Sequence, residues 1–415
     1  MIFPLYFGLA TITASLASPV SQPLPTAIID SGAIVGTTTA LPSSTAVVRQ
    51  YLGVPFGAPP VRFSPPEPVA RWSTFYNATQ WGTACIQQIG HSGKELFGML
   101  DLPPPANGEG EDCLNLNVFT PEAASAGSKA VLVWFYGGSY MNGATSVNLY
   151  DGTSFAANQD VVCLRKAPAL ELKQFAENAS LSFGPVPDGG VTLSATPRLD
   201  RLYSSEGNSS IARVPILIGN NADEPKPYIR GVNDTKAYLE TLGLGEYVDM
   251  VLEVYPLGQP GAHNENDRLS LIATDLLMHC PSKVLADDSA KVGIPSYRYF
   301  FNASFPNNEA FPGSGAFHAA EIGFVFGTYP KENATQFEHE VSQAMQKAWA
   351  DFAKDPSQGP GWGKGPMIGV FGDGVKAGMS DVGKKALVAV DSTIMDRRCE
   401  LYKPLYDQLV LSSSS

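Results

Sequence analysis

The chain has 415 residues, of which 44% are hydrophobic and 16% are charged. These values exclude an intrinsically disordered chain and describe a globular protein that is long enough to bury a sizeable core. The formal net charge of −12 at pH 7 argues against nucleic acids and anionic membrane surfaces as partners.

The first 17 residues predict a secretory signal peptide. They are apolar and end in Ser15-Leu16-Ala17, a small-x-small cleavage pattern, and a proline-rich stretch follows. The segment begins without Lys or Arg, so a short buried segment stays open as an alternative. No other run is long enough to span a bilayer. We therefore expect a secreted, extracellular protein without a membrane span.

Potential glycosylation sites are distributed along the chain. Six N-x-Ser/Thr sequons together favour a glycosylated, secreted surface, although each is weak by itself. They lie at Asn77, Asn178, Asn208, Asn233, Asn302 and Asn333.

Strand patterns dominate the first third of the chain. Residues 27–51 predict short antiparallel strands at the edge of a mixed sheet. Residues 111–121 alternate apolar and polar positions, which predicts a strand that faces the core. Residues 130–140, AVLVWFYGGSY, predict a buried strand that runs into paired glycines. Such a glycine loop has the backbone freedom to aim N–H groups at an anion.

These motifs carry a resemblance to a known family. EDCLNLNVFTP at 111–121, followed by VLVWFYGGSY at 131–140, resembles the type B carboxylesterase/lipase family, the cholinesterase-like branch of the α/β-hydrolases. YLGVPFGAPPVRF at 51–63 resembles the N-terminal hallmark of the same family. The resemblance implies an α/β fold, with a mixed, mostly parallel sheet flanked by helices, in a single domain over residues 18–415.

The resemblance also implies a chemistry. Family members hydrolyse carboxylic esters with a serine, a glutamate and a histidine, so we expect a small-molecule or lipid ester substrate and neither cofactor nor metal. The backbone N–H groups of Gly138 and Ser139, next to Gly137, would form the oxyanion hole. The family has a third glycine where this chain has Ser139, whose Cβ restricts φ.

The family pattern is interrupted between residues 162 and 163. Family members continue from a strand near residues 160–162 to the nucleophile elbow, a G-x-S-x-G turn. Here Val162 is followed directly by Cys163-Leu164-Arg165, a motif that the family places well beyond the elbow, and no G-x-S-x-G occurs in the chain. We expect that a segment on the order of a hundred residues or more is missing, with several central strands and the nucleophile. The chain as written would then be inactive and would expose strand edges.

Downstream the family pattern resumes. FGPVPDG at 183–189 resembles a turn of the family, and residues 212–224 predict a strand that ends in acids. The resemblance assigns Glu224 as the acid that orients the catalytic histidine. AFHAAEIGFVFG at 316–327 resembles the catalytic-histidine loop and assigns His318 as the general base. The residues alone also allow two plainer interpretations, in which Glu224 belongs to a solvated acidic loop and His318 is an ordinary histidine. The sequence TQFE at 335–338 predicts a capping box that begins an amphipathic helix.

The chain has five cysteines, an odd number. The resemblance implies two disulfides, Cys85–Cys113 and Cys280–Cys399. Cys163 stays outside these pairs, and a buried thiol is the plain alternative to a lost partner.

Three hypotheses follow from the interruption. The chain is a secreted ester hydrolase whose written sequence lost an internal exon, a non-catalytic cholinesterase-like binding protein, or a splice product or pseudogene without function. We prefer the first for what the gene encodes, and inactivity for the chain as written.

Overall fold

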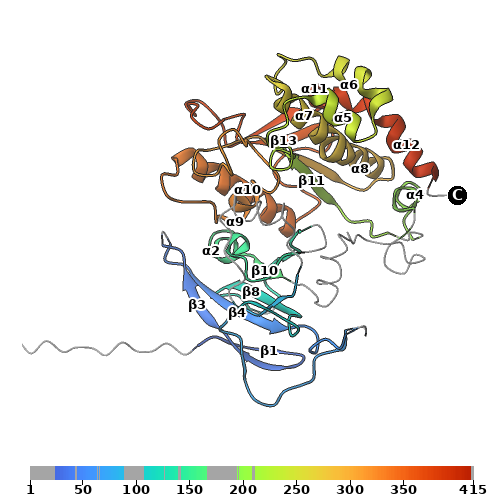
Figure 1. Cartoon of the computed structure of the whole chain (residues 1–415). Helices are drawn as coiled ribbons and strands as arrows, with labels where there is room; N and C mark the ends of the chain where they lie inside the picture. The colour runs from blue at the N-terminus through green and yellow to red at the C-terminus, as the bar shows by residue number, and fades with distance from the viewer. Residues whose placement is uncertain are drawn as a thin grey trace, which may run out of the picture.

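The structure of the protein is a computed structural model (Figure 1). The predicted signal peptide, Ser139, Asn178, Asn208 and the 183–189 turn lie outside the residues that it describes. The described residues are 24–42, 44–62, 64, 66–87, 107–125, 127–138, 142–165, 194, 196–207 and 211–412.

The first half of the chain builds a mixed five-stranded sheet in the order β3-β4-β8-β10-β9. Its strands are antiparallel except for β9 and β10, which run parallel. The remaining strands of this part of the chain form two smaller sheets, one of order β1-β2-β5 and one made of β6 and β7. The strands are β1 (Thr26–Ile29), β2 (Gly32–Val35), β3 (Thr37–Ala40), β4 (Val47–Pro55), β5 (Tyr76–Asn77), β6 (Ala84–Cys85), β7 (Glu109–Gly110), β8 (Asn115–Pro121), β9 (Val131–Trp134) and β10 (Val162–Arg165). The antiparallel strands predicted over residues 27–51 are confirmed.

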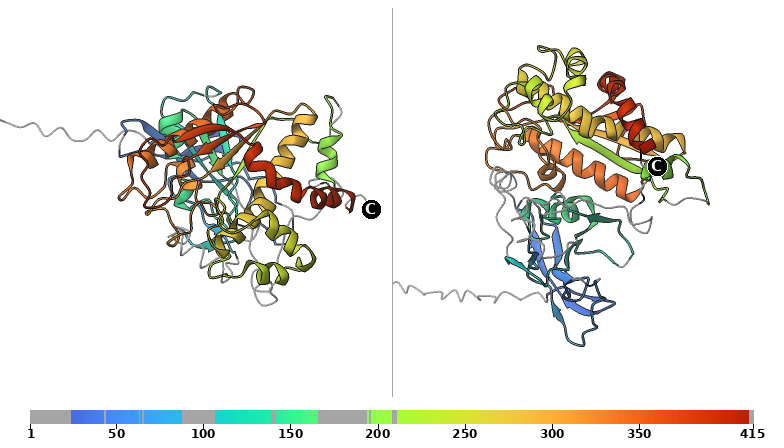
Figure 2. Two further views of the ribbon diagram at one scale, coloured as in Figure 1. Left: turned by 90° about the horizontal axis from the view of Figure 1, so that it is seen from above. Right: turned by 45° about the vertical axis from the view of Figure 1, so that its right-hand side comes forward.

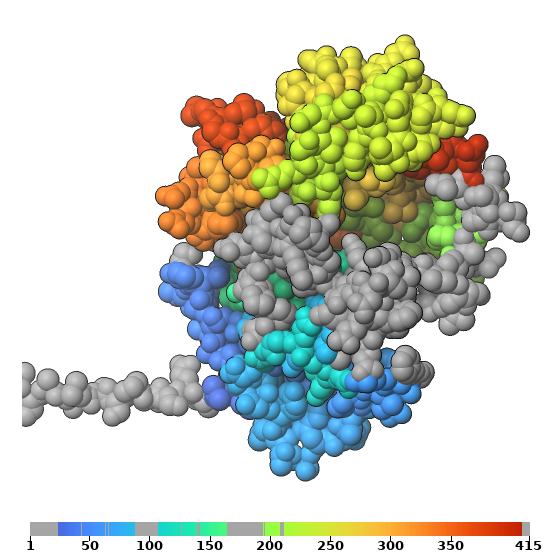
Figure 3. Space-filling model, viewed as in Figure 1, coloured from blue at the N-terminus to red at the C-terminus, as the bar shows by residue number. Residues whose placement is uncertain are grey.

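The second half builds a separate four-stranded sheet in the order β11-β12-β13-β14. Strands β11 (Ile216–Asn221), β12 (Ser296–Phe301) and β13 (Met367–Phe371) are parallel, and β14 (Leu387–Asp391) is antiparallel to β13. Figures 1 and 2 show this sheet and its helices on one side of the molecule and the blue N-terminal strands on the other, and Figure 3 shows the same division at the surface.

Helices surround the second sheet and lie between the two sheets. Helix α8 packs on β11 and β12, whereas α10 contacts both β13 and β9 and so connects the two halves. The helices are α2 (Thr153–Gln159), α4 (Pro197–Leu202), α5 (Thr235–Thr241), α6 (Val248–Val254), α7 (Glu265–Thr274), α8 (Cys280–Lys291), α9 (Ile322–Phe326), α10 (Gln336–Lys354), α11 (Thr393–Asp396) and α12 (Lys403–Ser412). Three 3-10 helices, η1 (Asn148–Tyr150), η2 (Gly245–Tyr247) and η4 (Arg397–Leu401), and one π-helix, η3 (Asp275–His279), complete the set in the described residues. None of the described helices is long and apolar enough to cross a membrane.

Helix α10 begins at the predicted capping box. The Thr335 hydroxyl accepts the N–H of Glu338 at 3.2 Å, and the Glu338 carboxylate accepts the N–H of Thr335 at 2.8 Å. Val341, Met345 and Ala348 recur at helical spacing and are buried in the main core. The helical prediction is therefore confirmed.

One large hydrophobic core joins the two halves. Phe119 and Phe155 from the first half are buried in the same cluster as Phe301, Phe324 and Met345 from the second. A contiguous cluster of this kind supplies the main favourable term for folding, because it removes apolar area from water on both sides at once.

Strands β9 and β11 are edge strands of the two larger sheets, whose other edges are β3 and β14. Strand β9 pairs with β10, and β11 pairs with β12, and neither strand has a second partner among the described residues. The buried strand predicted within residues 130–140 is half exposed instead: Val131, Val133 and Phe135 are 52%, 53% and 68% exposed. These three alternate along one face, while Leu132 and Trp134 pack on the core. Strand β9 is exposed because nothing in the described part of the chain covers that face.

The 162/163 junction lies inside a strand. Strand β10 continues from Val162 through Cys163, which lies opposite Leu132 of β9 and Phe119 of β8. Cys163 is only 1% exposed. The two sides of the interrupted family pattern are thus joined in one regular element.

Candidate active site

Glu224 follows strand β11 at its carboxyl end. A tight turn begins after it, in which Pro225 accepts hydrogen bonds from the N–H groups of Tyr228 and Ile229 through its carbonyl oxygen. Pro225 suits the start of such a turn because its φ is fixed. Glu224 itself is 7% exposed, so its carboxylate needs hydrogen-bond partners inside the protein.

The loop that carries His318 is tied to the same turn. The Asp223 N–H donates to the Ala316 carbonyl at 2.9 Å, and the Ala316 N–H donates to the Asp223 carboxylate at 2.9 Å. Gly315 has φ +64° and lies so close that a Cβ there would collide with the Asp223 carboxylate. One backbone hydrogen bond and one hydrogen bond to the Asp223 side chain thus hold the two loops together next to the site.

The two loops bring Glu224 and His318 into direct contact. His318 Nδ1 donates to Glu224 Oε2 at 2.6 Å, and the His318 N–H donates to the Glu224 carbonyl at 3.2 Å. The hydrogen bond to Glu224 raises the pKa of His318, and burial opposes this rise. The His318 side chain is 45% exposed, and its Nε2 has no hydrogen-bond partner in the described part of the chain. A base oriented by a carboxylate, with its second nitrogen open, can take a proton from an attacking hydroxyl.

Two further residues of this site were missed by the sequence reasoning. Asn221 Nδ2 donates to the Phe317 carbonyl at 2.8 Å and to Glu321 Oε2 at 2.5 Å. Burial raises the pKa of the Glu321 carboxyl to about 7, and the nearby charge of Glu224 acts in the same direction. Glu321 lies inside the histidine motif, so the motif could have pointed to it, whereas nothing in the sequence around Asn221 does.

The glycine loop follows β9 of the other sheet. Gly138 has φ +140°, and a Cβ there would collide with the Asn142 carbonyl, so only glycine fits. Gln87 braces the loop, because its side-chain amide both donates to and accepts from the backbone of Gly143. The N–H groups of Gly137 and Gly138 donate no hydrogen bond within the described ranges, nor does any hydrogen bond there join this loop to Glu224 or His318.

The structure contains both disulfides that the resemblance implies. Cys85 and Cys113 are bonded at 2.04 Å and Cys280 and Cys399 at 1.98 Å. Cys163 takes part in neither bond and is buried in β10.

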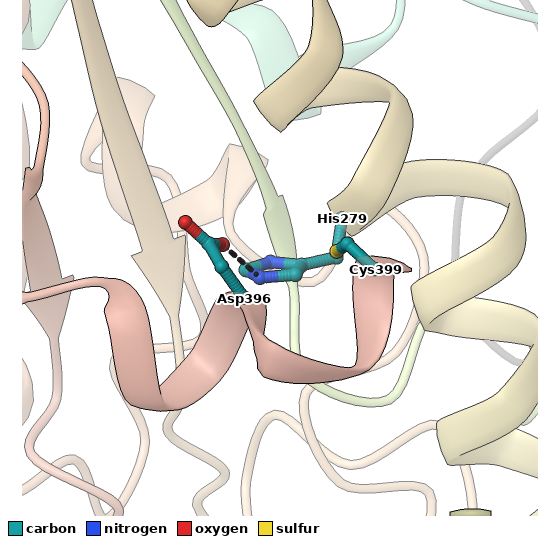
Figure 4. A group of neighbouring side chains, drawn as sticks. All are labelled: His279, Asp396 and Cys399. Carbon is teal, nitrogen blue, oxygen red and sulfur yellow. Dashed lines mark hydrogen bonds and ion pairs between the residues drawn. The ribbon is translucent and has the colours of Figure 1, made fainter. Parts of the chain in front are cut away.

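A second group of titratable side chains lies at the N-terminal end of helix α8 (Figure 4). His279 Nε2 lies 3.0 Å from Asp396 and close to the Cys399 sulfur. The disulfide removes the thiolate that a metal would need, and Arg298 Nη1 already binds both oxygens of Asp396, at 3.0 and 2.8 Å. Arg298 and Asp396 thus form a buried ion pair that supports the fold.

Four of the six sequons lie in the described part of the chain. Asn77, Asn233 and Asn333 are exposed, as an acceptor of a glycan must be. Asn302 is half-buried and its side-chain oxygen accepts a hydrogen bond from Lys376 at 3.0 Å.

Glu224 follows strand β11, and His318 lies on the loop after the neighbouring parallel strand β12. An acid and a histidine paired in this way define the class of site used by α/β-hydrolases. A profile of the carboxylesterase family matches residues 23–163 and again residues 161–364. The chain therefore belongs to the carboxylesterase family and has an incomplete version of the α/β-hydrolase fold.

Individual relatives agree with this assignment. The chain is 34% identical over 170 residues to the acetylcholinesterase of Electrophorus electricus. This aligned stretch covers 39% of this chain and 25% of that protein. It is 38% identical over 135 residues to human carboxylesterase 5A, covering 32% and 23%. It is 36% identical over 163 residues to rabbit (Oryctolagus cuniculus) liver carboxylesterase 1, covering 37% and 28%. The matched stretches thus span about a quarter of each of these relatives.

Proposed function

We propose that the gene encodes a secreted, glycosylated carboxylic ester hydrolase that uses a Ser–Glu–His mechanism, and that the chain as written lacks the nucleophilic serine. The observation that carries this proposal is the 2.6 Å contact of His318 Nδ1 with Glu224, while His318 Nε2 stays open. His318 would take the serine proton and return it to the leaving alcohol, and Glu224 would stabilise the charged imidazole. Gly137, Gly138 and Ser139 would supply the N–H groups that bind the oxyanion.

Three observations support the absence of an internal segment. The family profile matches in two pieces that meet at residues 161–163. No G-x-S-x-G occurs in the sequence. Strands β9 and β11 each keep one edge open, and they belong to two separate sheets. A strand that leads to a nucleophile elbow would pair with such an open edge, and the helix that follows the elbow would cover the exposed face of β9.

The first experiment is to determine the transcript sequence across the codons for Val162 and Cys163. We expect in-frame sequence there that encodes a G-x-S-x-G and a cysteine able to pair with Cys163. A continuous transcript without an insert would contradict the missing-exon hypothesis and favour a binding protein or a product without function.

A second experiment tests the inactivity of the written chain. The chain is expressed alone and assayed with a short acyl ester, beside the His318→Ala variant. We expect no hydrolysis above the uncatalysed rate from either protein, because covalent acyl transfer needs the nucleophile. Hydrolysis by the written chain that disappears in His318→Ala would show that another group attacks the ester.

A further inference from the structure

Asn221 contacts both loops of the acid–histidine pair. Its backbone N–H donates to Glu224 Oε1 at 2.7 Å. Its side-chain Nδ2 donates one hydrogen bond to the Phe317 carbonyl at 2.8 Å and the other to Glu321 Oε2 at 2.5 Å. Asn221 is 1% exposed, at the last position of β11. One buried residue thus links the loop of the acid, the loop of the histidine and the start of helix α9.

We propose that Asn221 and Glu321 are positioning residues that fix the geometry of the Glu224–His318 pair. This inference rests on the proposed function for its catalytic meaning, although the contacts themselves do not depend on it. The Phe317 carbonyl precedes His318 directly, so the bond from Asn221 and the bond from the His318 N–H to Glu224 hold the histidine backbone from both sides. A general base must be held this closely, because a displacement of about 1 Å breaks a bond of this length.

Glu321 completes the arrangement by accepting the second Nδ2 proton of Asn221. An asparagine has two such protons in one plane, so two acceptors on different loops determine the orientation of its amide. Replacing Glu321 by a residue that cannot accept a hydrogen bond would leave a buried donor without a partner, which is costly in a protein interior.

The charge state of His318 reports on this arrangement. The titratable and charged groups that surround the pair are Glu224 and Glu321, the Tyr228 ring at 6.2 Å from the His318 ring, Tyr299 of β12, and the Asp223–Lys376 ion pair at 3.1 Å. The hydrogen bond that His318 donates to Glu224 is the largest cause that raises the His318 pKa. Loosening the loops should therefore lower that pKa, and removing the Glu321 charge should act in the same direction.

The experiment measures the reaction of His318 with diethyl pyrocarbonate, which modifies neutral imidazole. The full chain is isolated as a soluble monomer, and the rate at His318 is followed from pH 5 to 9 by peptide mass spectrometry. The variants are Asn221→Ala and Glu321→Gln. Asn266→Ala is the matched control, because Asn266 Nδ2 also donates to two backbone carbonyls, of Ile229 and Val232, at 2.8 and 3.1 Å. The exposed His339 is the internal reference in every digest.

We expect Asn221→Ala to shift the His318 midpoint to lower pH and to raise its rate at pH 7 about twofold. Glu321→Gln, which keeps the volume and can still accept from Asn221, should give a smaller shift in the same direction. Asn266→Ala should leave the midpoint unchanged. A folded Asn221→Ala protein with the original midpoint, or an equal shift in Asn266→Ala, would overturn the proposal.

If Asn221→Ala does not fold, the test uses Glu321→Gln alone. An unchanged His318 midpoint in this variant refutes the proposal, and a lowered midpoint supports it. No ester is involved in these measurements. The proposed function can therefore fail in the hydrolysis assay while the positioning of His318 is supported, or the reverse.

Discussion

Asp396 is the residue whose replacement should damage the fold most clearly. It is 8% exposed and accepts hydrogen bonds from Arg298 at 2.8 Å, His279 at 3.0 Å and Ser392 at 2.7 Å. The Asp396→Asn variant keeps the shape and removes the charge, which leaves the buried Arg298 guanidinium without a counter-ion. Removing one partner of a buried ion pair costs about 3–5 kcal/mol, a large part of the roughly 5–15 kcal/mol that stabilises a typical domain.

The assay is urea unfolding followed by circular dichroism, with Asp391→Asn as the control. Asp391 is an exposed carboxylate only five positions earlier, and it accepts hydrogen bonds from Thr393. We expect a large loss of unfolding free energy for Asp396→Asn and a small change for Asp391→Asn. A loss below about 1 kcal/mol for Asp396→Asn would show that the pair contributes no more than a surface ion pair.

The same variant predicts a pH dependence. Burial alone would raise the pKa of Asp396, but the hydrogen bonds from His279 and Arg298, with the Arg298 charge, hold it well below its ordinary value. A carboxyl whose folded pKa is depressed contributes stability above its unfolded pKa and loses it as the pH falls through the folded pKa. The difference in unfolding free energy between the original chain and Asp396→Asn should therefore be largest near pH 7 and decrease toward pH 2. An equal difference at both pH values would contradict this assignment.

Three further predictions address other parts of the molecule. The pKa of Glu321 rises from 4.5 to about 7, so its ionisation in the folded state opposes folding as the pH increases through this window. The unfolding free energy of Glu321→Gln relative to the original chain should therefore increase by about 2–3 kcal/mol between pH 5 and pH 8, and an equal difference at both pH values would refute this. Thr335→Ala removes the cap of α10 and should cost about 1 kcal/mol in the same assay; no loss would mean that the cap contributes nothing. Val133→Lys places a charge on the open face of β9 and should reduce aggregation measured by light scattering, whereas unchanged scattering would place the aggregating surface elsewhere.

Much of the site could be predicted because its residues lie in contiguous motifs. Glu224 ends a strand pattern and His318 sits in a run of twelve family-like residues, and the structure brings the two together. Asn221 could not be found in this way. Its partners Phe317 and Glu321 are 96 and 100 residues away in the sequence, and only the folded chain brings them to the end of β11.

The fold shows a similar division. The capping box at Thr335 is a local signal, so the start of α10 could be predicted to the residue. The burial of strand β9 could not, because hydrophobic residues such as Val131 and Val133 predict a buried strand whether or not a neighbour is present. The burial of Arg298 within β12 could not be predicted either, because its counter-ion Asp396 lies 98 residues further along the chain.

The two disulfides are confined to separate halves of the chain. One closes a span of 28 residues before the 162/163 junction and the other a span of 119 residues after it. Neither crosses the junction, so extra residues inserted there would lengthen a backbone connection without pulling on either crosslink. The two halves could also be produced as separate polypeptides, each already crosslinked, and mixed with a third chain that supplies the strand and the serine that we propose are missing. Recovery of ester hydrolysis from three fragments would then be a matter of reassembly rather than of refolding a single long chain.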